Sequence, residues 1–249
     1  MGRFWERLRG SEAGGTEDVA RNIGGTLLRH VPPEYDRETT LEENWRRYYE
    51  WALELPQPAV QIVEHGLEVR RHPIGFTAVY LTERLYGMGT PWGRGIIRAN
   101  IIEPRKGREP LRDDIHSHGY RFVSGLVDGE VTNNRYPGIF PFEQAEDGDP
   151  DAYVGYETRP SEVGANKVML MIQPSLIPKA EPHELKIGEG YAMQPFDEID
   201  APDEFHSLAS DGGITIFGKT PAGVARMLDR SNRSIIFRSV GAPPPPPEY

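Results

Sequence analysis

The sequence predicts an all-β barrel with a helical extension at its N-terminus. From position 59 onward, short runs of β-branched and aromatic residues alternate with glycine, proline and charged turns, which is the pattern of sandwiches and barrels. The 249 residues include 27 glycines and 23 prolines, a composition that suits many short strands better than a helical bundle. The strand-like runs are numerous enough to close a barrel.

The N-terminal extension is expected over residues 1–56 and contains the clearest helical pattern of the chain. Between Thr40 and Leu53, apolar and aromatic residues recur at helical spacing, and Thr40 with Glu43 matches a capping box. An aromatic stripe of this kind predicts a helix packed against the outside of a sheet. Alternatively, these aromatic residues could form a dimer contact or belong to a lid.

The barrel is expected at 57–241, with a long insertion at about 137–165 and a proline-rich tail at 242–249. The insertion is too long and too polar for a tight hairpin, so we expect a loop, either a lid or binding loop or a plain surface loop. The run of prolines in the tail cannot continue a strand or a helix, so we expect a disordered segment or a proline-rich ligand for a partner domain. The predicted strands are 59–63, 75–81, 95–102, 114–126, 130–136, 168–172, 184–193, 205–210, 214–217 and 234–238.

Composition excludes several classes of function. Acidic residues outnumber basic ones by 38 to 28, and the net charge of −10 argues against a nucleic-acid or membrane-surface partner. The chain has no cysteine, so disulfides, thiolate metal sites and a cysteine nucleophile are excluded. No apolar run approaches the roughly 20 residues needed to span a bilayer, and the charged N-terminus lacks the apolar region of a signal peptide. We therefore expect a cytoplasmic protein.

Two histidines stand two positions apart in the predicted strand 114–126. On a strand, residues i and i+2 point to the same face, so His116 and His118 would both face the barrel interior and could share one metal ion. A third ligand is needed from a neighbouring strand, and His206 is the best candidate because it lies at the start of the predicted strand 205–210. A histidine pair can also simply face water, but the apolar run that follows this pair favours a strand in the sheet interior.

This segment resembles the cupin superfamily, whose first motif is G(X)5HXH(X)3-4E(X)6G. His116 and His118 match the HxH and Gly129 matches the closing glycine, whereas Phe122 occupies the position of the usual glutamate ligand. The segment 188–206 is similar to a degenerate second motif. The resemblance covers about half the chain and implies a cupin-type double-stranded β-helix barrel.

A cupin without the glutamate is similar to the three-histidine branch, best known from the thiol dioxygenases. This resemblance implies Fe(II) held by neutral imidazoles, with open positions for substrate and dioxygen. It also implies that Arg98, on the predicted strand before the histidine pair, binds a substrate carboxylate. Tyr120 shares the inward parity of His118, so Arg98 and Tyr120 are the candidate catalytic residues. The thiol enzymes carry a Ser-x-His-x-Tyr run on a late strand, and residues 214–217 lack it. We therefore expect the metal of these enzymes in this chain but not their thiol substrate.

The metal and its remaining ligands stay open. Glu189 or Glu198 could replace the missing carboxylate, and Asp113 and Asp114 could accept hydrogen bonds from imidazole N–H groups. Three imidazoles bind zinc, nickel and manganese as well as iron, because selection depends on geometry and availability.

The sequence therefore predicts a metal-dependent cupin enzyme, most directly a non-heme Fe(II) oxygenase or dioxygenase. Its substrates would be dioxygen and a small polar metabolite that carries a carboxylate. The alternatives are an isomerase, lyase or hydrolase that uses Zn, Ni or Mn, and a non-catalytic cupin that binds a small molecule. The resemblance also implies a homodimer, since cupin barrels often pair.

Overall fold

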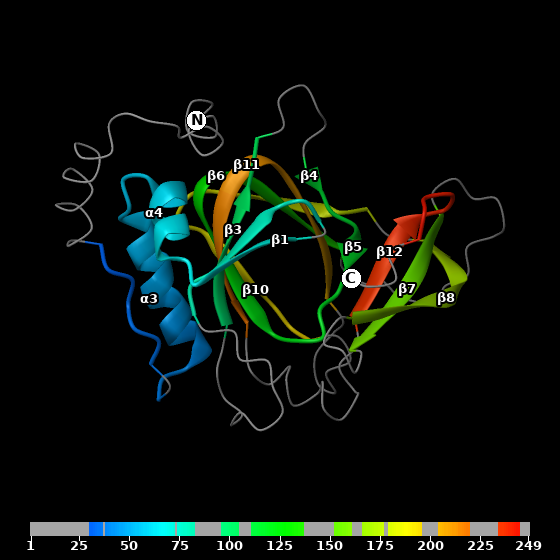
Figure 1. Cartoon of the computed structure of the whole chain (residues 1–249). Helices are drawn as coiled ribbons and strands as arrows, with labels where there is room; N and C mark the ends of the chain where they lie inside the picture. Colours follow the sequence, from blue (N-terminus) through cyan, green and yellow to red (C-terminus); the bar gives the residue numbers. More distant parts are fainter. Residues whose placement is uncertain are drawn as a thin grey trace, which may run out of the picture. The chain divides into compact units, whose positions relative to one another are not determined.

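The structure, a computed structural model, describes residues 30–36, 38–72, 74–82, 96–104, 111–136, 152–160, 166–176, 179–195, 204–219 and 234–244. The chain divides into two compact units, Met1–Pro33 and Glu34–Tyr249. Every described helix and strand belongs to the second unit, and Figure 1 labels most of these elements. Residues 1–29 of the predicted extension and residues 245–249 of the predicted tail lie outside the described part of the chain. In the described part, no helix is long and apolar enough to cross a membrane.

Twelve strands in the described ranges form one antiparallel sheet, which confirms the predicted all-β class. The strands are β1 (Glu68–Arg71), β2 (Thr77–Tyr80), β3 (Ile96–Ile102), β4 (Leu111–Arg112), β5 (Ile115–His116), β6 (Phe122–Tyr136), β7 (Ala152–Pro160), β8 (Asn166–Leu176), β9 (Glu181–Leu185), β10 (Gly190–Met193), β11 (Phe205–Lys219) and β12 (Ser234–Ser239).

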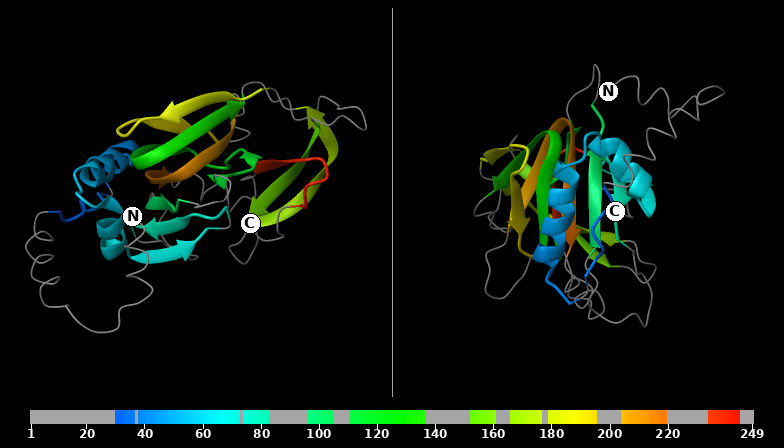
Figure 2. Two further views of the ribbon diagram at one scale, coloured as in Figure 1. Left: turned by 90° about the horizontal axis from the view of Figure 1, so that it is seen from above. Right: turned by 90° about the vertical axis from the view of Figure 1, so that its left-hand side faces the viewer.

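The long strand β11 is the centre of this sheet. Along one path the strand order is β1-β2-β3-β11-β5-β12-β7-β8, while β6 pairs with β11 and carries β9 and β10 beyond it. The second half of β11 pairs with β3 and its first half pairs with β4 and β5. Figure 2 shows the strands folded into two layers, with β6, β10 and β11 in one layer and β1 to β3 in the other.

Several predicted strands have different bounds in the structure. The predicted strands 205–210 and 214–217 are one strand, because β11 continues through a register shift between them. The predicted strand 114–126 is interrupted instead, since β5 ends at His116 and β6 begins at Phe122. The range expected to be a loop, 137–165, contains β7, which pairs along its length with β12.

Within the described residues, two helices precede the sheet in the sequence. Helix α3 (Leu41–Leu53) matches the predicted helix, and the Thr40 hydroxyl caps it by accepting a hydrogen bond from the backbone N–H of Glu43 at 3.1 Å. Helix α4 (Pro58–His65) covers the predicted strand 59–63, so that prediction is wrong. Proline is well tolerated at the first helical position, and the short apolar run after it does not distinguish a strand from a helix by its period.

The aromatic face of α3 packs on β6 and β11, as the sequence predicts. The Trp45 indole N–H donates a hydrogen bond to the carbonyl oxygen of Ile216 at 3.0 Å, and the Trp45 and Tyr49 rings stack at 4.7 Å between centroids. Glycine allows this close approach, because a Cβ at Gly125 would lie 2.8 Å from the Tyr49 ring and one at Gly218 would lie 2.9 Å from the Trp45 ring.

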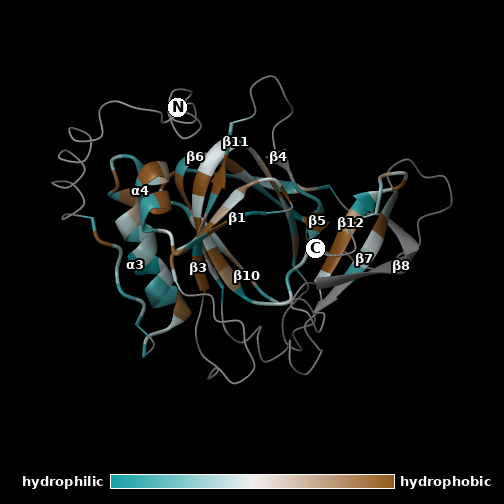
Figure 3. Ribbon diagram, in the orientation of Figure 1, coloured by the Kyte–Doolittle hydropathy of each residue, from teal (hydrophilic) through white to brown (hydrophobic). Residues whose placement is uncertain are grey.

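Apolar clusters lie on both sides of β11. One cluster is built mainly from β2, β6 and β9, and its buried members are Phe76, Ala78, Tyr80, Ile102, Leu126, Val131 and Leu185. The other joins β5, β11 and β12 through Ile115, Phe205, Ile235 and Phe237. In Figure 3, brown marks the apolar residues of β3 and β12, whereas much of α3 is teal. Of the three histidines that the sequence singles out, His206 lies at the start of β11, His116 lies on β5 and His118 follows β5 by two residues.

Candidate metal centre

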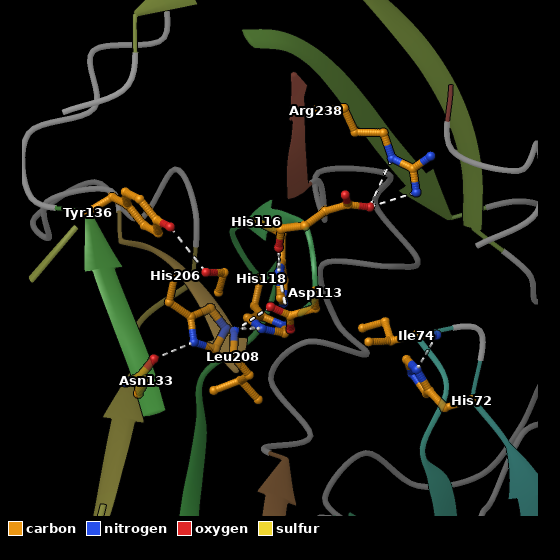
Figure 4. Close-up of polar contacts among 12 residues, drawn as sticks. His72, Ile74, Asp113, His116, His118, Asn133, Tyr136, His206, Leu208 and Arg238 are labelled. Carbon is orange, nitrogen blue, oxygen red and sulfur yellow. Dashed lines mark hydrogen bonds and ion pairs between the residues drawn. The ribbon is translucent and has the colours of Figure 1, made fainter. Parts of the chain in front are cut away.

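The pairing of β5 with β11 brings three histidines together. His116 on β5 and His206 on β11 are register partners, and His118 follows β5 by two residues. The two Nε2 atoms of His118 and His206 lie 3.0 Å apart. Ring centroids are separated by 4.7 Å from His116 to each of the other two and by 5.2 Å between His118 and His206. One ligand nitrogen from each residue lies within 4.8 Å of the others, and Figure 4 shows the rings converging.

Hydrogen bonds fix the orientation of two of these imidazoles. Nδ1 of His116 lies 2.7 Å from the backbone carbonyl oxygen of Asp114. A carbonyl oxygen only accepts, so this Nδ1 carries the hydrogen and Nε2 of His116 keeps its lone pair. Nδ1 of His206 lies 3.0 Å from Oδ1 of Asn133, which is fully buried.

Burial keeps the three imidazoles neutral. Desolvation lowers the pKa of His116, and it lowers the pKa of His118 and His206 well below the usual value. The positive charges of Lys219 and Arg98 lower the pKa of His118 further. Neutral imidazole is the form that binds a metal ion, so the electrostatics of the cluster favour metal binding without prior loss of a proton.

The acidic residues before the histidine pair contribute differently from the expectation. The Asp114 carboxylate pairs with Arg238, with Oδ2 2.7 Å from Nη2, so only its backbone carbonyl reaches His116. The buried Asp113 carboxyl accepts a hydrogen bond from the backbone N–H of Leu208, and its Oδ2 lies 3.9 Å from Nδ1 of His116. Burial raises the pKa of Asp113 well above its usual value. The main chain, rather than a carboxylate, orients His116.

Phe122, which stands at the motif position of the cupin glutamate, lies beside the cluster. Phe122 is 1% exposed, and its ring centroid lies 4.5 Å from that of His118 and 5.9 Å from that of His206. The Phe217 ring stacks on the Phe122 ring, with 4.9 Å between the two ring centroids. The departure from the motif at Phe122 therefore gives the cluster an apolar neighbour in place of a negative charge.

No carboxylate joins the histidine group among the described residues. Glu189 stands in the turn between β9 and β10, where its Oε2 accepts a hydrogen bond from the backbone N–H of Lys186 at 2.9 Å. Its carbonyl oxygen lies 3.1 Å from the hydroxyl of Tyr49 on α3, away from the cluster. Glu198, the other candidate, lies outside the described residues.

Arg98 lies on β3 with its guanidinium among aromatic rings. The guanidinium carbon is 4.7 Å from the ring centroid of Phe217 and 5.6 Å from that of Phe76, and Nη1 is 3.5 Å from the hydroxyl of Tyr80. Its Nε is buried without a hydrogen-bond partner. Within the described ranges, no carboxylate forms an ion pair with Arg98. An arginine in this setting has the capacity to bind an added anion.

Tyr120 also lies at the cluster. Its ring centroid is 5.3 Å from that of His118, and Nζ of Lys219 lies 3.8 Å from the Tyr120 centroid. Tyr120 is thus a direct neighbour of His118, whereas Arg98 acts on His118 only through its charge. Lys219 adds a second cation.

Sequence reasoning missed two polar neighbours of the cluster. His72, between β1 and β2, stacks on Phe76 at 4.2 Å, and burial together with the charges of Arg98 and His116 lowers its pKa to about 3. Asn133 was not singled out although it carries the contact to His206. A polar residue in the middle of an otherwise apolar strand face is the signal that could have found Asn133, whereas nothing local marks His72.

The residues present fit a divalent transition metal. Two of the three imidazoles have their Nδ1 held by an oxygen atom, and all three are neutral and converge on one point. Nitrogen donors of this kind suit zinc, iron, nickel and copper, whereas magnesium and calcium prefer oxygen ligands. The fold and this group together define an all-β protein, built on one antiparallel sheet, with a three-histidine group that fits a metal ion.

Comparisons with known proteins find cupins among the solved structures that are similar to this chain. No family model and no curated protein matches the chain. Among solved structures, an RmlC-like cupin from Shewanella frigidimarina is similar at 14% identity and a TM-score of 0.29, covering 64% of this chain and 86% of its own. The Drosophila melanogaster CENP-C cupin domain is similar at 8% identity and a TM-score of 0.32, covering 83% and 99%.

A hydroquinone 1,2-dioxygenase from Sphingomonas sp. TTNP3 is similar as well, at 9% identity and a TM-score of 0.26. The match covers 51% of this chain and 59% of the dioxygenase chain. These similar structures include a dioxygenase and the CENP-C cupin domain, and at such low identity and TM-score they carry no argument about this chain.

Proposed function

We propose that this protein is a metal-dependent enzyme, and specifically a non-heme Fe(II) enzyme that reacts a small anionic metabolite with dioxygen. The observation that carries the proposal is the convergence of three neutral imidazoles on one point: His116 from β5, His118 just after β5 and the buried His206 from β11. Bringing three imidazoles together away from bulk water costs desolvation energy. A shared metal ion would offset that cost.

A bound Fe(II) would supply open coordination positions at which substrate and dioxygen react. The protein's own residues set the charge of the site. Three neutral ligands and the apolar neighbour Phe122 would leave a dication without a carboxylate ligand among the described residues. Such a centre favours an anionic substrate.

Arg98 is proposed to bind the anionic group of that substrate. Its guanidinium lacks a carboxylate partner in the described part of the chain, and its Nε is buried without a hydrogen bond. The rings of Phe217 and Phe76 hold the guanidinium through cation–π contacts and leave its N–H edge to a ligand. Tyr120, beside His118, would shape the pocket between the anion and the metal.

The proposal is tested by metal content and oxygen consumption. The protein is purified without a histidine tag beside a His116→Ala/His118→Ala variant, with His183→Ala as the control because that histidine is exposed on β9. Near-stoichiometric iron in the wild type and the control, lost in the double variant, is the expected result. Oxygen consumption with small carboxylic acids should depend on the same histidines.

Two other results would overturn the oxygenase proposal. Zinc, nickel or manganese in place of iron, with activity that survives without oxygen, would assign a hydrolase, lyase or isomerase built on the same three ligands. The absence of any metal after anaerobic reconstitution with Fe(II) would leave a barrel that only binds a small molecule.

A further inference from the structure

A buried amide lies directly behind one of the three imidazoles. Asn133 on β6 is 0% exposed, and its Oδ1 lies 3.0 Å from Nδ1 of His206, which is 1% exposed. Figure 4 shows the amide and the imidazole joined on the side of the ring away from His118. Asn133 is not one of the three candidate metal ligands, so this contact is additional to the histidine group.

The strand register explains why these two side chains meet. On the β6–β11 pair, His206 is opposite Arg135 and Leu208 is opposite Asn133. Residues two apart on a strand share a face, so Asn133 and His206 are diagonal neighbours on the face that carries the cluster. The next residue, Asn134, is opposite Ser207 and belongs to the other face.

The hydrogen bond decides which nitrogen of His206 carries the hydrogen. A neutral imidazole has one N–H and one lone pair, and an amide oxygen only accepts, so Nδ1 must be the N–H when Oδ1 faces it. Nε2 then presents its lone pair, and this is the atom that lies 3.0 Å from Nε2 of His118. The opposite tautomer would point a hydrogen into the cluster and remove one metal ligand.

The amide is costly to keep at this position. Nδ2 of Asn133 is buried and has no hydrogen-bond partner within the described residues. An unpartnered buried N–H group is a net loss in stability, and a leucine of similar volume would avoid it. Packing alone therefore gives no reason for an asparagine here, whereas orientation of His206 does.

We propose that Asn133 is a positioning residue that holds His206 in the Nδ1–H tautomer and so keeps its Nε2 free for a metal ion. The consequence for metal binding rests on the proposed function, but the tautomer is a property of the metal-free protein. Orientation of a ligating histidine by a partner on its other nitrogen typically changes metal affinity by about 10- to 100-fold.

The test begins with the tautomer, read from 15N–1H NMR correlations of the imidazole nitrogens in the metal-free protein at neutral pH. In the wild type we expect the His206 hydrogen on Nδ1. Asn133→Leu removes the acceptor, so the signal should shift toward the Nε2–H form. Asn133→Asp keeps an acceptor oxygen at Nδ1 and should retain the wild-type tautomer. Asn134→Leu, on the opposite face, is the matched control and should leave His206 unchanged.

The second readout is the affinity for Zn2+, measured by competition with a chelator. Asn133→Leu should weaken it by about 10- to 100-fold, and Asn133→Asp should stay within a few-fold of the wild type. A purely structural amide would make both variants equally poor or equally good, which would overturn the proposal. If Asn133→Leu does not fold, the wild-type tautomer and the Asn133→Asp affinity decide the matter.

The two proposals fail in different ways. A wild-type His206 with its hydrogen on Nε2 overturns the role of Asn133 even if the protein binds metal. A wild-type His206 in the Nδ1–H form, in a protein that binds no metal, supports the role of Asn133 and overturns the proposed function.

Discussion

His116 and His206 face each other as register partners across β5 and β11, with ring centroids 4.7 Å apart. These two residues are 90 positions apart in the sequence, and backbone pairing alone places them side by side. The third member, His118, then needs only the two-residue repeat of an extended chain to reach the same point. The strand register therefore fixes His116 and His206, whereas His118 lies in the short segment between β5 and β6.

The first prediction concerns the most buried of these ligands. His206→Gln keeps a polar side chain of similar size but removes one imidazole from the group. We expect the affinity for Zn2+ to fall by more than about 100-fold, because loss of an outer hydrogen-bond partner alone costs about 10- to 100-fold. Competition with a chelator measures this, and circular dichroism checks the fold. Unchanged affinity in a folded variant would exclude His206 from the metal site.

The histidine cluster could be predicted from the sequence because each member stands in a short, recognisable sequence pattern. His116 and His118 are related by the strand repeat, and His206 stands at the start of a recognisable strand. The orientation of the rings could not be found in this way. It depends on the diagonal contact of Asn133 with His206 and on a carbonyl oxygen at Asp114, and both follow from cross-strand register that no local pattern encodes.

The fold class and one helix could likewise be predicted from the sequence, whereas α4 and β7 could not. The turn-rich composition and the short apolar runs gave the all-β class, and the capping box gave α3. The predicted strand 59–63 became helix α4 because a short apolar run fits both periods and Pro58 starts a helix well. β7 was hidden in the range 137–165, since its pairing partner β12 lies about 80 residues further along the chain.

The second prediction is a dependence of stability on pH that His72 carries. Its pKa is lowered to about 3 by burial, Arg98 and His116, whereas an unfolded histidine titrates near 6.5. Between these values the unfolded chain binds more protons at this position, so the free energy of unfolding falls as the pH falls. One such group adds at most about 1.4 kcal/mol per pH unit.

His72→Phe isolates this contribution, because phenylalanine preserves the ring that stacks on Phe76. The clustered histidines act in the same direction and Asp113, with its raised pKa, acts in the opposite one, but all are common to both proteins. Urea unfolding between pH 7 and 5 should give a shallower pH dependence for the variant. If the free energy of unfolding depends on pH equally in the wild type and the variant, the pKa of His72 is not lowered in the folded protein.

The third prediction tests the packing of α3 on the sheet. A Cβ at Gly218 would lie 2.9 Å from the Trp45 ring and 3.2 Å from its Cβ, so Gly218→Ala must displace the helix or the strand. We expect a loss of about 1–3 kcal/mol in the free energy of unfolding, as for other overpacked sites. Urea unfolding followed by circular dichroism measures it.

The double variant Trp45→Leu/Gly218→Ala provides the control for that clash. Leucine vacates the space next to the new methyl group, so the combined loss should be smaller than the sum of the two single losses. Strict additivity would place the cost of Gly218→Ala in the backbone of β11 instead of in its contact with α3.

The last prediction separates anion binding from metal binding. Arg98→Met removes the cation but retains a flexible apolar side chain between Phe76 and Phe217. Metal content should stay at the wild-type level, because Arg98 is not among the three histidines that form the metal group. Affinity of the metal-loaded protein for small carboxylic acids should fall by at least about 10-fold, the loss of one charge-assisted hydrogen bond. Calorimetry with each acid and its uncharged amide gives the comparison: the amides should bind both proteins equally, and equal loss for acids and amides would mean that Arg98 shapes the pocket without binding the anion.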